Sequence, residues 1–501
     1  GSEYAIDCQL TEDGDLTIMS GGVERASASF SHDAWFKITI EADLNTNSWE
    51  LLIDDVSQGM FSNATYQVAS LDLFPVNNSN NSSGYWIDDI SYNHTAYTPT
   101  ALNASVVNVI VPGAIAGTDQ TPSVEVRNLG TTNINSYDIE ILYNGSTITK
   151  SVTGQNIAQN GTYSVDMDDL ITLTAGNNPA VATISNINGG ADDVATDNVK
   201  TVYLNPIIPA TGKMVVGEEA TGTWCGWCPR GAVALDNMEA NYHDYFIGIA
   251  VHNNDPMEDE VYDAGVGTFV SGYPSGLVDR QGDIDPGDFE ANFLDRITTP
   301  TVVTLTSGAA YNATNDSLKV SITSTFIDDA TGNYKMALVI TEDGLSGTSS
   351  DWSQSNSYAG GGSGVMGGYE ALPNPVPAAQ MVYDHVARVI LPDVDGLANS
   401  FPATVASGET KVVNFYFDNN PEWDLTKINV VSMLIAPDGS IDNAGYAPMA
   451  DATTNGFVES AVIFDGSTGL GIETNTNDKA IIIFFLGNIV TISSIDLSII
   501  L

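Results

Sequence analysis

The sequence predicts a multidomain, mainly β protein in which β-sandwich domains flank a single α/β domain. The chain has 501 residues, which is too long for one domain and suggests about three to five. Lys and Arg together number only 15, whereas Gly alone numbers 46, and this composition favours strands joined by polar turns. Most segments alternate apolar and polar residues with a period of two, as half-buried strands do, and one segment instead alternates strand and helix patterns.

The first two domains are expected over residues 1–100 and 103–206. Trp35–Glu41 and Trp49–Asp54 alternate with a period of two, which indicates half-buried antiparallel strands. In the second range, short strand patterns recur at regular spacing with Asn-Gly turn signals between them. This arrangement is typical of an immunoglobulin-like sandwich.

Two further domains are expected over residues 210–298 and 299–455, followed by a tail at 456–501. In the first of these, the apolar run Phe246–Val251 is followed by helical patterns, so strands and helices alternate as in an α/β layer. The second returns to period-two strands and is expected to form another β-sandwich. It contains a Gly/Ser/Pro-rich excursion over 346–379, and loops of this length usually have a role of their own or are disordered.

Charge and hydropathy exclude two classes of partner. The 63 Asp and Glu residues outnumber the 15 Lys and Arg residues, so the net charge is 15 − 63 = −48. Such a surface repels nucleic acid and anionic membranes. The sequence has no apolar run near the roughly 20 residues that span a membrane, and its N-terminus has neither a basic nor an apolar leader. We therefore expect an extracellular or bacterial cell-surface protein that has lost its signal peptide or that begins internally.

The pentapeptide Trp-Cys-Gly-Trp-Cys at 224–228 contains two of the three cysteines of the chain. It follows an apolar run and precedes a helical pattern, and this context indicates a thiol–disulfide redox site. A cysteine at a helix N-terminus is stabilised as a thiolate, so Cys225 is expected to be the exposed nucleophile and Cys228, one turn further on, the resolving cysteine. A zinc site would need two more ligands, and neither Cys8 nor the histidines have the required spacing.

The segment Glu218–Gly231 resembles the active-site segment of thioredoxin-fold proteins. In particular it resembles a family of secreted or outer-membrane-associated bacterial proteins with the signature G-x-W-C-G-x-C-P-x-G. The resemblance implies a thioredoxin-like domain at 210–298 with a β-domain after it, and a disulfide between the two cysteines of the motif. The chain departs from thioredoxin in having Gly-Trp rather than Gly-Pro between the cysteines.

The same resemblance implies roles for three more residues. A buried acid is expected six residues before Cys225 (225 − 6 = 219), which is Glu219, and it would take up the proton that the resolving cysteine loses. Pro274 would be the cis-proline whose neighbouring backbone pairs with a substrate strand. Trp224 would shield the disulfide.

Both ends of the chain carry weaker resemblances. Residues 85–92 resemble the closing strand of concanavalin-like (laminin-G-like) jelly rolls, which implies a partial jelly roll whose other strands were processed away or are supplied by another chain. Within it, Asp88 and Asp89 are candidate calcium ligands, or else one is a buried cap and the other a solvated side chain. Residues 103–206 resemble the spacer domains of bacterial adhesins.

The tail resembles the C-terminal sorting domain of type IX secretion substrates at Gly471–Glu473 and Val490–Ser493. This resemblance implies the type IX machinery or a surface anchor as a partner. Alternatively, the tail is a donor strand that completes a neighbouring subunit, or one more strand of the preceding sandwich.

Three other residues are minor candidates. His252 with Asp255 is expected near Cys225, because its strand ends at the same edge of the sheet, although a structural hydrogen-bonded role competes. His385 is expected to be structural. Cys8 is either a free buried thiol or an intermolecular link.

Two functions remain open at this point. The first is a secreted or cell-surface thiol–disulfide oxidoreductase that acts on protein thiols or disulfides, with no cofactor and calcium as the one candidate ion. The second is a non-enzymatic adhesion or fibre-forming protein in which the cysteine pair is a structural disulfide. In that case, self-assembly would use the tail or the incomplete first domain.

Overall fold

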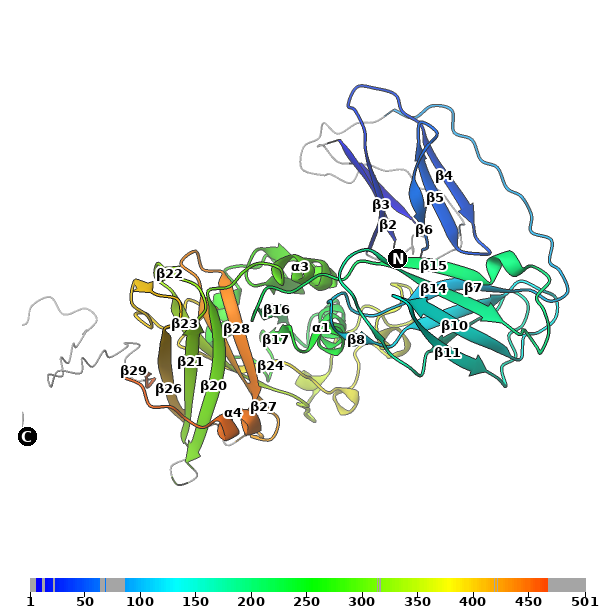
Figure 1. The fold of residues 1–501 in the computed structure, drawn as a ribbon. Coiled ribbons are helices and arrows are strands. Elements are labelled where there is room, and N and C mark those ends of the chain that lie inside the picture. Colours follow the sequence, from blue (N-terminus) through cyan, green and yellow to red (C-terminus); the bar gives the residue numbers. More distant parts are fainter. Residues whose placement is uncertain are drawn as a thin grey trace, which may run out of the picture.

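A computed structural model describes residues 6–10, 14–20, 23–63, 68, 86–312, 314, 317–418, 420 and 422–466. These residues are mainly β, as the sequence predicts. Figure 1 shows a first part in blue, a second in cyan to teal, and a larger third part that runs from green to red.

The first part consists of two three-stranded antiparallel sheets around a small core of Leu16, Ile18 and Leu51. The strands of one sheet are β1 (Asp7–Leu10), β2 (Asp15–Ser20) and β3 (Val23–Ser29), and those of the other are β4 (Ile38–Asp43), β5 (Ser48–Ile53) and β6 (Val56–Phe61).

The prediction of a closing strand at 85–92 is wrong for the residues of that range that the structure describes. Residues 86–100 have no regular secondary structure, and the side chains of Trp86 and Tyr92 are 88% and 86% exposed. Alternation predicts which side chains would share a face, but a strand also needs a neighbouring edge to pair with, and none of the described strands pairs with this segment.

The second part is a β-sandwich whose core includes Val124, Val126 and Ile141. One sheet contains β10 (Tyr137–Tyr143), β11 (Ser146–Val152), β14 (Asn178–Ser185) and β15 (Val199–Leu204), and the other contains β7 (Ala104–Ile110), β9 (Ser123–Asn128) and β12 (Thr162–Asp166). A short pair, β8 (Asp119–Gln120) and β13 (Ile171–Thr172), and the 3₁₀ turn η1 (Ala195–Asp197) complete it.

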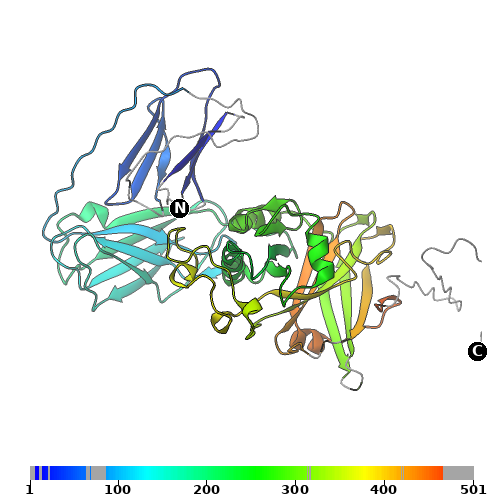
Figure 2. The ribbon, with the colours of Figure 1, turned by 180° about the vertical axis from the view of Figure 1, so that it is seen from behind.

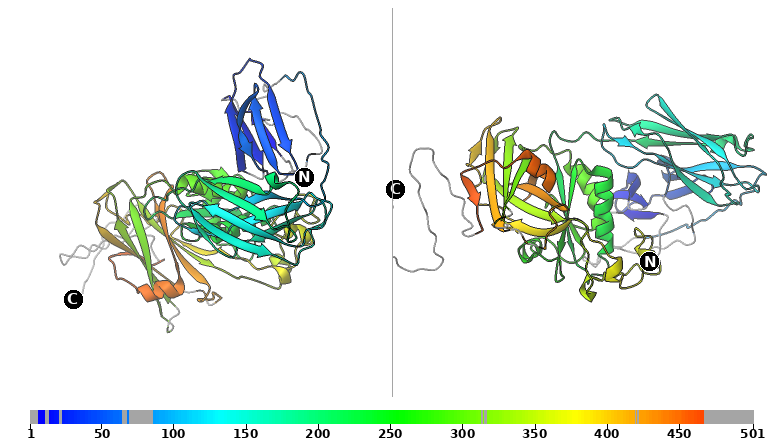
Figure 3. Two further views of the ribbon diagram at one scale, coloured as in Figure 1. Left: turned by 45° about the vertical axis from the view of Figure 1, so that its right-hand side comes forward. Right: turned by 90° about the horizontal axis from the view of Figure 1, so that it is seen from below.

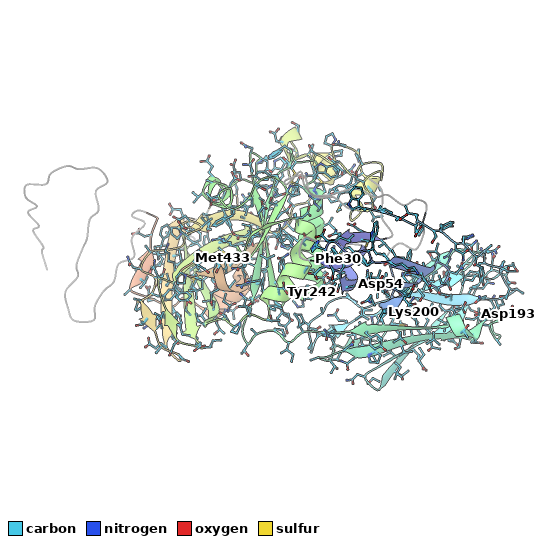
Figure 4. The ribbon with its side chains drawn as sticks, turned by 90° about the horizontal axis from the view of Figure 1, so that it is seen from above. Phe30, Asp54, Asp193, Lys200, Tyr242 and Met433 are labelled. Atoms are coloured by element: carbon cyan, nitrogen blue, oxygen red, sulfur yellow. A yellow bond between two sulfur atoms is a disulfide. The ribbon has the colours of Figure 1, made fainter. Side chains whose placement is uncertain are left out.

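Hydrogen bonds join the first two parts. The fully buried Asn47 donates from Nδ2 to the backbone oxygens of Asn63 and Val107, and Lys200 Nζ donates to those of Thr46 and Asn47. Figure 4 labels Lys200 where the strands of the two parts approach.

The third part is organised around one eight-stranded sheet with the order β19-β18-β16-β17-β24-β23-β27-β28. Its strands are β16 (Val215–Thr221), β17 (Phe246–His252), β18 (Ser275–Val278), β19 (Asp283–Ile284), β23 (Lys335–Glu342), β24 (Val386–Leu391), β27 (Ile428–Ile435) and β28 (Ile441–Pro448). The β16–β17 and β17–β24 pairs are parallel, and the others are antiparallel. The ranges 210–298 and 299–455 therefore share one sheet.

Helices cover the cysteine-bearing end of this sheet on both faces. Leu235 of α1 (Pro229–Tyr242) and Phe293 of α3 (Phe289–Arg296) pack with Val215 in one core, and Tyr262 of α2 (Glu260–Val266) packs with Val216 in another. Adjacent residues of a strand point to opposite faces, so α1 and α3 lie on one face and α2 on the other. The right-hand view of Figure 3 shows α1 in green beside the sheet, and Figure 4 labels Tyr242 at its end.

A four-stranded sheet packs on the other end of the eight-stranded sheet. Met336, Leu338 and Ile340 of β23 contribute to the core beneath it. Its strands are β20 (Val303–Asn312), β21 (Ser317–Phe326), β26 (Thr410–Asp418) and β29 (Val462–Phe464), and the remaining elements are β22 (Ala330–Thr331), β25 (Thr404–Val405), η2 (Pro286–Asp288) and α4 (Met449–Asn455).

A long segment over residues 343–385, here called the strap, joins β23 to β24. It contains three 3₁₀ turns, η3 (Ser350–Trp352), η4 (Tyr369–Ala371) and η5 (Ala378–Gln380). Val376, Met381 and Tyr383 of the strap form a small core with Met257. Figure 2 shows the strap, in yellow, as loops beside the green helices.

Candidate functional site

The cysteine pair lies between β16 and α1, where the sequence places it. Cys225 and Cys228 form a disulfide with their Cα atoms 5.4 Å apart. Pro229 is the first residue of α1, a position where a missing N–H group matters least. Cys225 is 5% exposed and Cys228 2%, so Cys225 is more buried than the exposed nucleophile that the sequence suggests.

Two half-exposed tryptophans flank the disulfide. Trp224 is 48% exposed, donates from Nε1 to the backbone oxygen of Asn253 at 2.8 Å, and its ring lies 5.3 Å from that of Tyr273. Trp227 is 47% exposed and lies edge-on to Tyr358 at 5.3 Å. Tyr273 is followed by Pro274, and the Tyr273–Pro274 peptide bond is cis.

Glu219 lies behind the disulfide and is 1% exposed. It points to the face of β16 that α1 covers, since a Cβ atom at Gly231 would collide with its carboxyl group. Its Oε1 has no hydrogen-bond partner among the described residues. Burial raises the pKa of Glu219 from 4.5 to about 8, although Thr221 acts in the opposite direction.

A cavity of about 60 Å³ lies beside Glu219 and Cys228. It lies between β16, β17, α1 and the strap. Its polar and titratable lining side chains are Glu219, Thr221, Cys228, Asp236, His252, Gln354, Tyr369, Tyr383, Asp384 and His385.

His252 and His385 both line this cavity, in different surroundings. His252 is 4% exposed, and its Nδ1 lies 2.7 Å from Oδ2 of Asp255. His385 Nε2 lies 3.4 Å from a carboxylate oxygen of Glu239 and 3.7 Å from one of Asp236. Burial lowers the pKa of His385, but these two carboxylates and that of Asp343 outweigh it and the pKa is raised.

The strap covers one side of the cysteine loop. The backbone N–H groups of Ser355 and Ser357 donate to the oxygens of Thr223 and Gly226 at 2.7 and 2.8 Å, and Gln354 Nε2 donates to the oxygen of Cys225 at 2.9 Å. The sequence indicates this segment only by its length and composition, so nothing in it predicts that the strap lies on the cysteine pair.

Gln354 is expected to hold the strap in place, because it is 5% exposed and its Nε2 also donates to the oxygens of Gly222 and Ser355. The variant Gln354→Ala leaves these carbonyl groups without that donor and should weaken strap docking by about 1–3 kcal/mol. Hydrogen exchange at the amides of Ser355 and Ser357 should then be roughly 5- to 150-fold faster. The exposed Gln380 provides the control, and equal exchange in Gln354→Ala and Gln380→Ala would contradict this role.

The other predicted candidates lie away from this site. Asp88 and Asp89 are exposed, and the Asp89 backbone donates to Asp88 Oδ1 at 2.9 Å. Within the described ranges, no group of three or more His, Cys, Asp and Glu side chains is arranged to hold a metal ion. Cys8 lies on β1 as a free, half-buried thiol, and burial raises its pKa to about 11. The tail motifs at 471–473 and 490–493 lie outside the described residues.

The described residues form a protein built mainly from β-domains. The model of the family described as "Outer membrane protein Omp28" matches residues 265–445. This match supports the predicted location, and the protein is extracellular or on the bacterial cell surface. In the part of the chain that the structure describes, no helix is long and apolar enough to cross a membrane.

Solved structures offer only distant similarity. A CARDB domain from Pyrococcus furiosus, solved with di-metal ions, is 18% identical, covers 24% of this chain and 100% of its own, and has a TM-score of 0.18. A protein from Agrobacterium tumefaciens is 14% identical, covers 50% of this chain and 100% of its own, and has a TM-score of 0.29. A putative cell surface protein from Methanosarcina acetivorans is 15% identical, covers 22% of this chain and 94% of its own, and has a TM-score of 0.18. None of the curated proteins matches the chain.

Proposed function

We propose that the protein is a secreted or cell-surface thiol–disulfide oxidoreductase with a thioredoxin-like unit around Cys225 and Cys228. One observation carries this proposal. A buried carboxyl group, Glu219, with one oxygen unpartnered among the described residues, lies behind a disulfide at the start of a helix, and its pKa is raised to about 8. A buried acid with a pKa near neutrality can exchange protons at physiological pH.

The proposed reaction passes two electrons from the reduced cysteine pair to a substrate disulfide. The Cys225 thiolate, favoured by the N-terminus of α1, attacks one substrate sulfur and releases the other as a thiolate. Cys228 then loses its proton to Glu219 and attacks the Cys225 sulfur, so the substrate leaves as a dithiol and the protein is oxidised. In this proposal, the backbone beside Pro274 aligns the substrate and Trp224 shields the disulfide.

Protein thiols or disulfides outside the cell are the proposed substrates. Export by the type IX route is also part of the proposal, and its support is the tail motifs alone. The reverse reaction, oxidation of a substrate dithiol, follows the same steps in the opposite order.

A structural disulfide in a non-enzymatic adhesion protein is the second candidate. The observation that favours it is the 5% exposure of Cys225 beneath a strap that hydrogen-bonds to the cysteine loop. In this case the exposed apolar residues of 86–92 are a candidate contact surface for self-assembly.

Insulin reduction by dithiothreitol tests the enzymatic proposal. The wild-type protein should accelerate insulin precipitation, and Cys225→Ser should remove the acceleration completely, because the nucleophile is lost. Cys228→Ser should instead accumulate a mixed disulfide with the substrate, visible by mass spectrometry. If the wild-type protein is no faster than Cys225→Ser, the pair is a structural disulfide.

A further inference from the structure

The cavity behind Cys228 contains a second group that can exchange protons. His252 ends β17 and lies next to Thr221 in the parallel β16–β17 pair, while Glu219 lies next to Ala250. Side chains two residues apart along a strand share a face, so His252 lies on the same face as Glu219, beneath the start of α1. Both residues, and Cys228, line the cavity.

Asp255 orients the imidazole ring of His252. The Asp255 carboxylate is itself fixed, since Oδ2 accepts from the backbone N–H of Thr223 at 2.9 Å and Oδ1 from that of Met257 at 2.9 Å. Because this carboxylate acts as an acceptor, the ring N–H at 2.7 Å is on Nδ1 and donates to Asp255. Nε2 of the neutral ring is then the atom that can accept a proton.

The surroundings suit proton transfer rather than simple packing. Polar groups make up about half of the cavity lining, and at about 60 Å³ the cavity is large enough for water. The edge of the His252 ring contacts Tyr383, with the ring centroids 5.7 Å apart. The titratable groups that line the cavity with His252 are Glu219 from β16, Cys228 just before α1, Asp236 from α1, and Tyr369, Tyr383, Asp384 and His385 from the strap.

We infer that His252, oriented by Asp255, is a second proton acceptor for Cys228 and works in parallel with Glu219. This inference rests on the proposed function. A parallel acceptor would let the resolving step proceed whether or not Glu219 already holds a proton. Asp255 is the positioning residue of this pair.

Atoms and electrons balance in this transfer without any additional reactant. The Cys228 thiol passes its proton to Nε2 of His252, directly or through water, and its sulfur bonds to the Cys225 sulfur. The bond between Cys225 and the substrate sulfur breaks, and the substrate leaves as a thiolate that takes a proton from solvent. His252 then returns its proton to solvent, and the two electrons of the former dithiol are on the substrate.

Two-phase kinetics with dithiobis(nitrobenzoate) test the inference in a Cys8→Ser background, where the cysteine pair is the only source of thiols. Attack by Cys225 releases the first thionitrobenzoate, and attack by Cys228 on the mixed disulfide releases the second. In a Glu219→Gln background, where the parallel acceptor is absent, His252→Asn should slow the second phase at least about tenfold at neutral pH and leave the first within about twofold. The double variant with Glu219→Gln should be slower than either single variant. Asp255→Asn should shift the pH profile of the second phase.

His243, 71% exposed on its side chain, is the matched control, and His243→Asn should leave both phases unchanged. A second phase that His252→Asn does not slow in the Glu219→Gln background overturns the inference.

Nuclear magnetic resonance of the wild-type protein avoids any folding defect of a variant. The chain has only five histidines, so His252→Asn assigns its ring signal. The ring signal of His252 should shift when the disulfide is reduced, because negative charge appears on the sulfur pair. An unchanged ring signal overturns the inference. Insulin activity with an unchanged ring signal would refute only the role of His252, whereas a shifted ring signal and a slowed second phase without insulin activity would refute only the proposed substrate reaction.

Discussion

Arg280→Met should lower the free energy of unfolding of the third part by about 3–5 kcal/mol, because it leaves a buried charge without its partner. The Arg280 side chain is fully buried, and its Nη2 lies 2.7 Å from Oε1 of Glu218 while its Nε lies 2.9 Å from Oε2. The Tyr262 hydroxyl group donates to the same Glu218 carboxylate at 2.7 Å. Removing the guanidinium group leaves the carboxylate with one donor in a medium where the charge is poorly solvated.

Denaturant unfolding followed by tryptophan fluorescence measures this change. The control is Lys411→Met, which breaks an ion pair with Glu409 whose side chains are 33% and 47% exposed, and it should change stability by less than about 1 kcal/mol. The double variant Arg280→Met with Glu218→Leu should recover part of the loss, since a buried pair can be replaced by apolar groups. Equal effects of Arg280→Met and Lys411→Met would contradict the account.

Glu218 and Glu219 are neighbours in β16 with opposite electrostatic surroundings. Glu218 faces α2 and is paired with Arg280, whereas Glu219 faces α1 and has a carboxyl oxygen with no hydrogen-bond partner among the described residues. Removing one partner of the Glu218–Arg280 pair would leave a buried charge unpaired, whereas Glu219 has no ion-pair partner to lose in the described part of the chain. A buried polar atom without a partner calls for an explanation, and this contrast is the physical reason to look for chemistry on the α1 side of the strand.

Local patterns predicted part of this site. The strand–cysteine–helix order places the disulfide at the start of α1, and the end of β17 brings His252 and Asp255 to the same edge; both follow from the periods of strands and helices, which depend on residues close in sequence. The position of Glu219 is instead implied by the resemblance to thioredoxin-fold proteins, through the six-residue offset from Cys225.

Long-range packing determined the rest. The strap hydrogen-bonds to residues 222–226 through contacts more than a hundred residues apart, which no local pattern encodes. The same limit explains why one sheet runs through two expected domains, and why 86–92 forms no strand although its sequence alternates. The burial of Cys225 also arises only when the rest of the third part is assembled around it.

Glu219→Gln should stabilise the oxidised protein at pH 7 by on the order of 3 kcal/mol, the direction opposite to most substitutions in a core. The folded-state pKa of about 8 lies above the ordinary value of 4.5, so the folded protein holds a proton that the unfolded chain has lost between these values. The wild-type protein should therefore lose stability as pH rises from about 4.5 to 8. Glutamine stays neutral at every pH. The difference in the free energy of unfolding between the variant and the wild type therefore reports the stability lost through Glu219, without the contribution of other titrating groups.

Parallel unfolding curves between pH 4 and pH 9 measure that difference. The two proteins should agree within about 1 kcal/mol at pH 4, where Glu219 is protonated in both states, and diverge through neutrality. Glu260 is exposed, and Glu260→Gln should show no such divergence. A stability difference between Glu219→Gln and wild type that is constant with pH would mean that Glu219 is not the buried acid described.

If Glu219→Gln is more stable at pH 7 yet slower in the second thionitrobenzoate phase, then the chain retains a destabilising carboxyl group for proton transfer, as expected of an active site. A structural disulfide would give the gain in stability without the loss of rate, and this pairing of measurements separates the two candidate functions at a single residue.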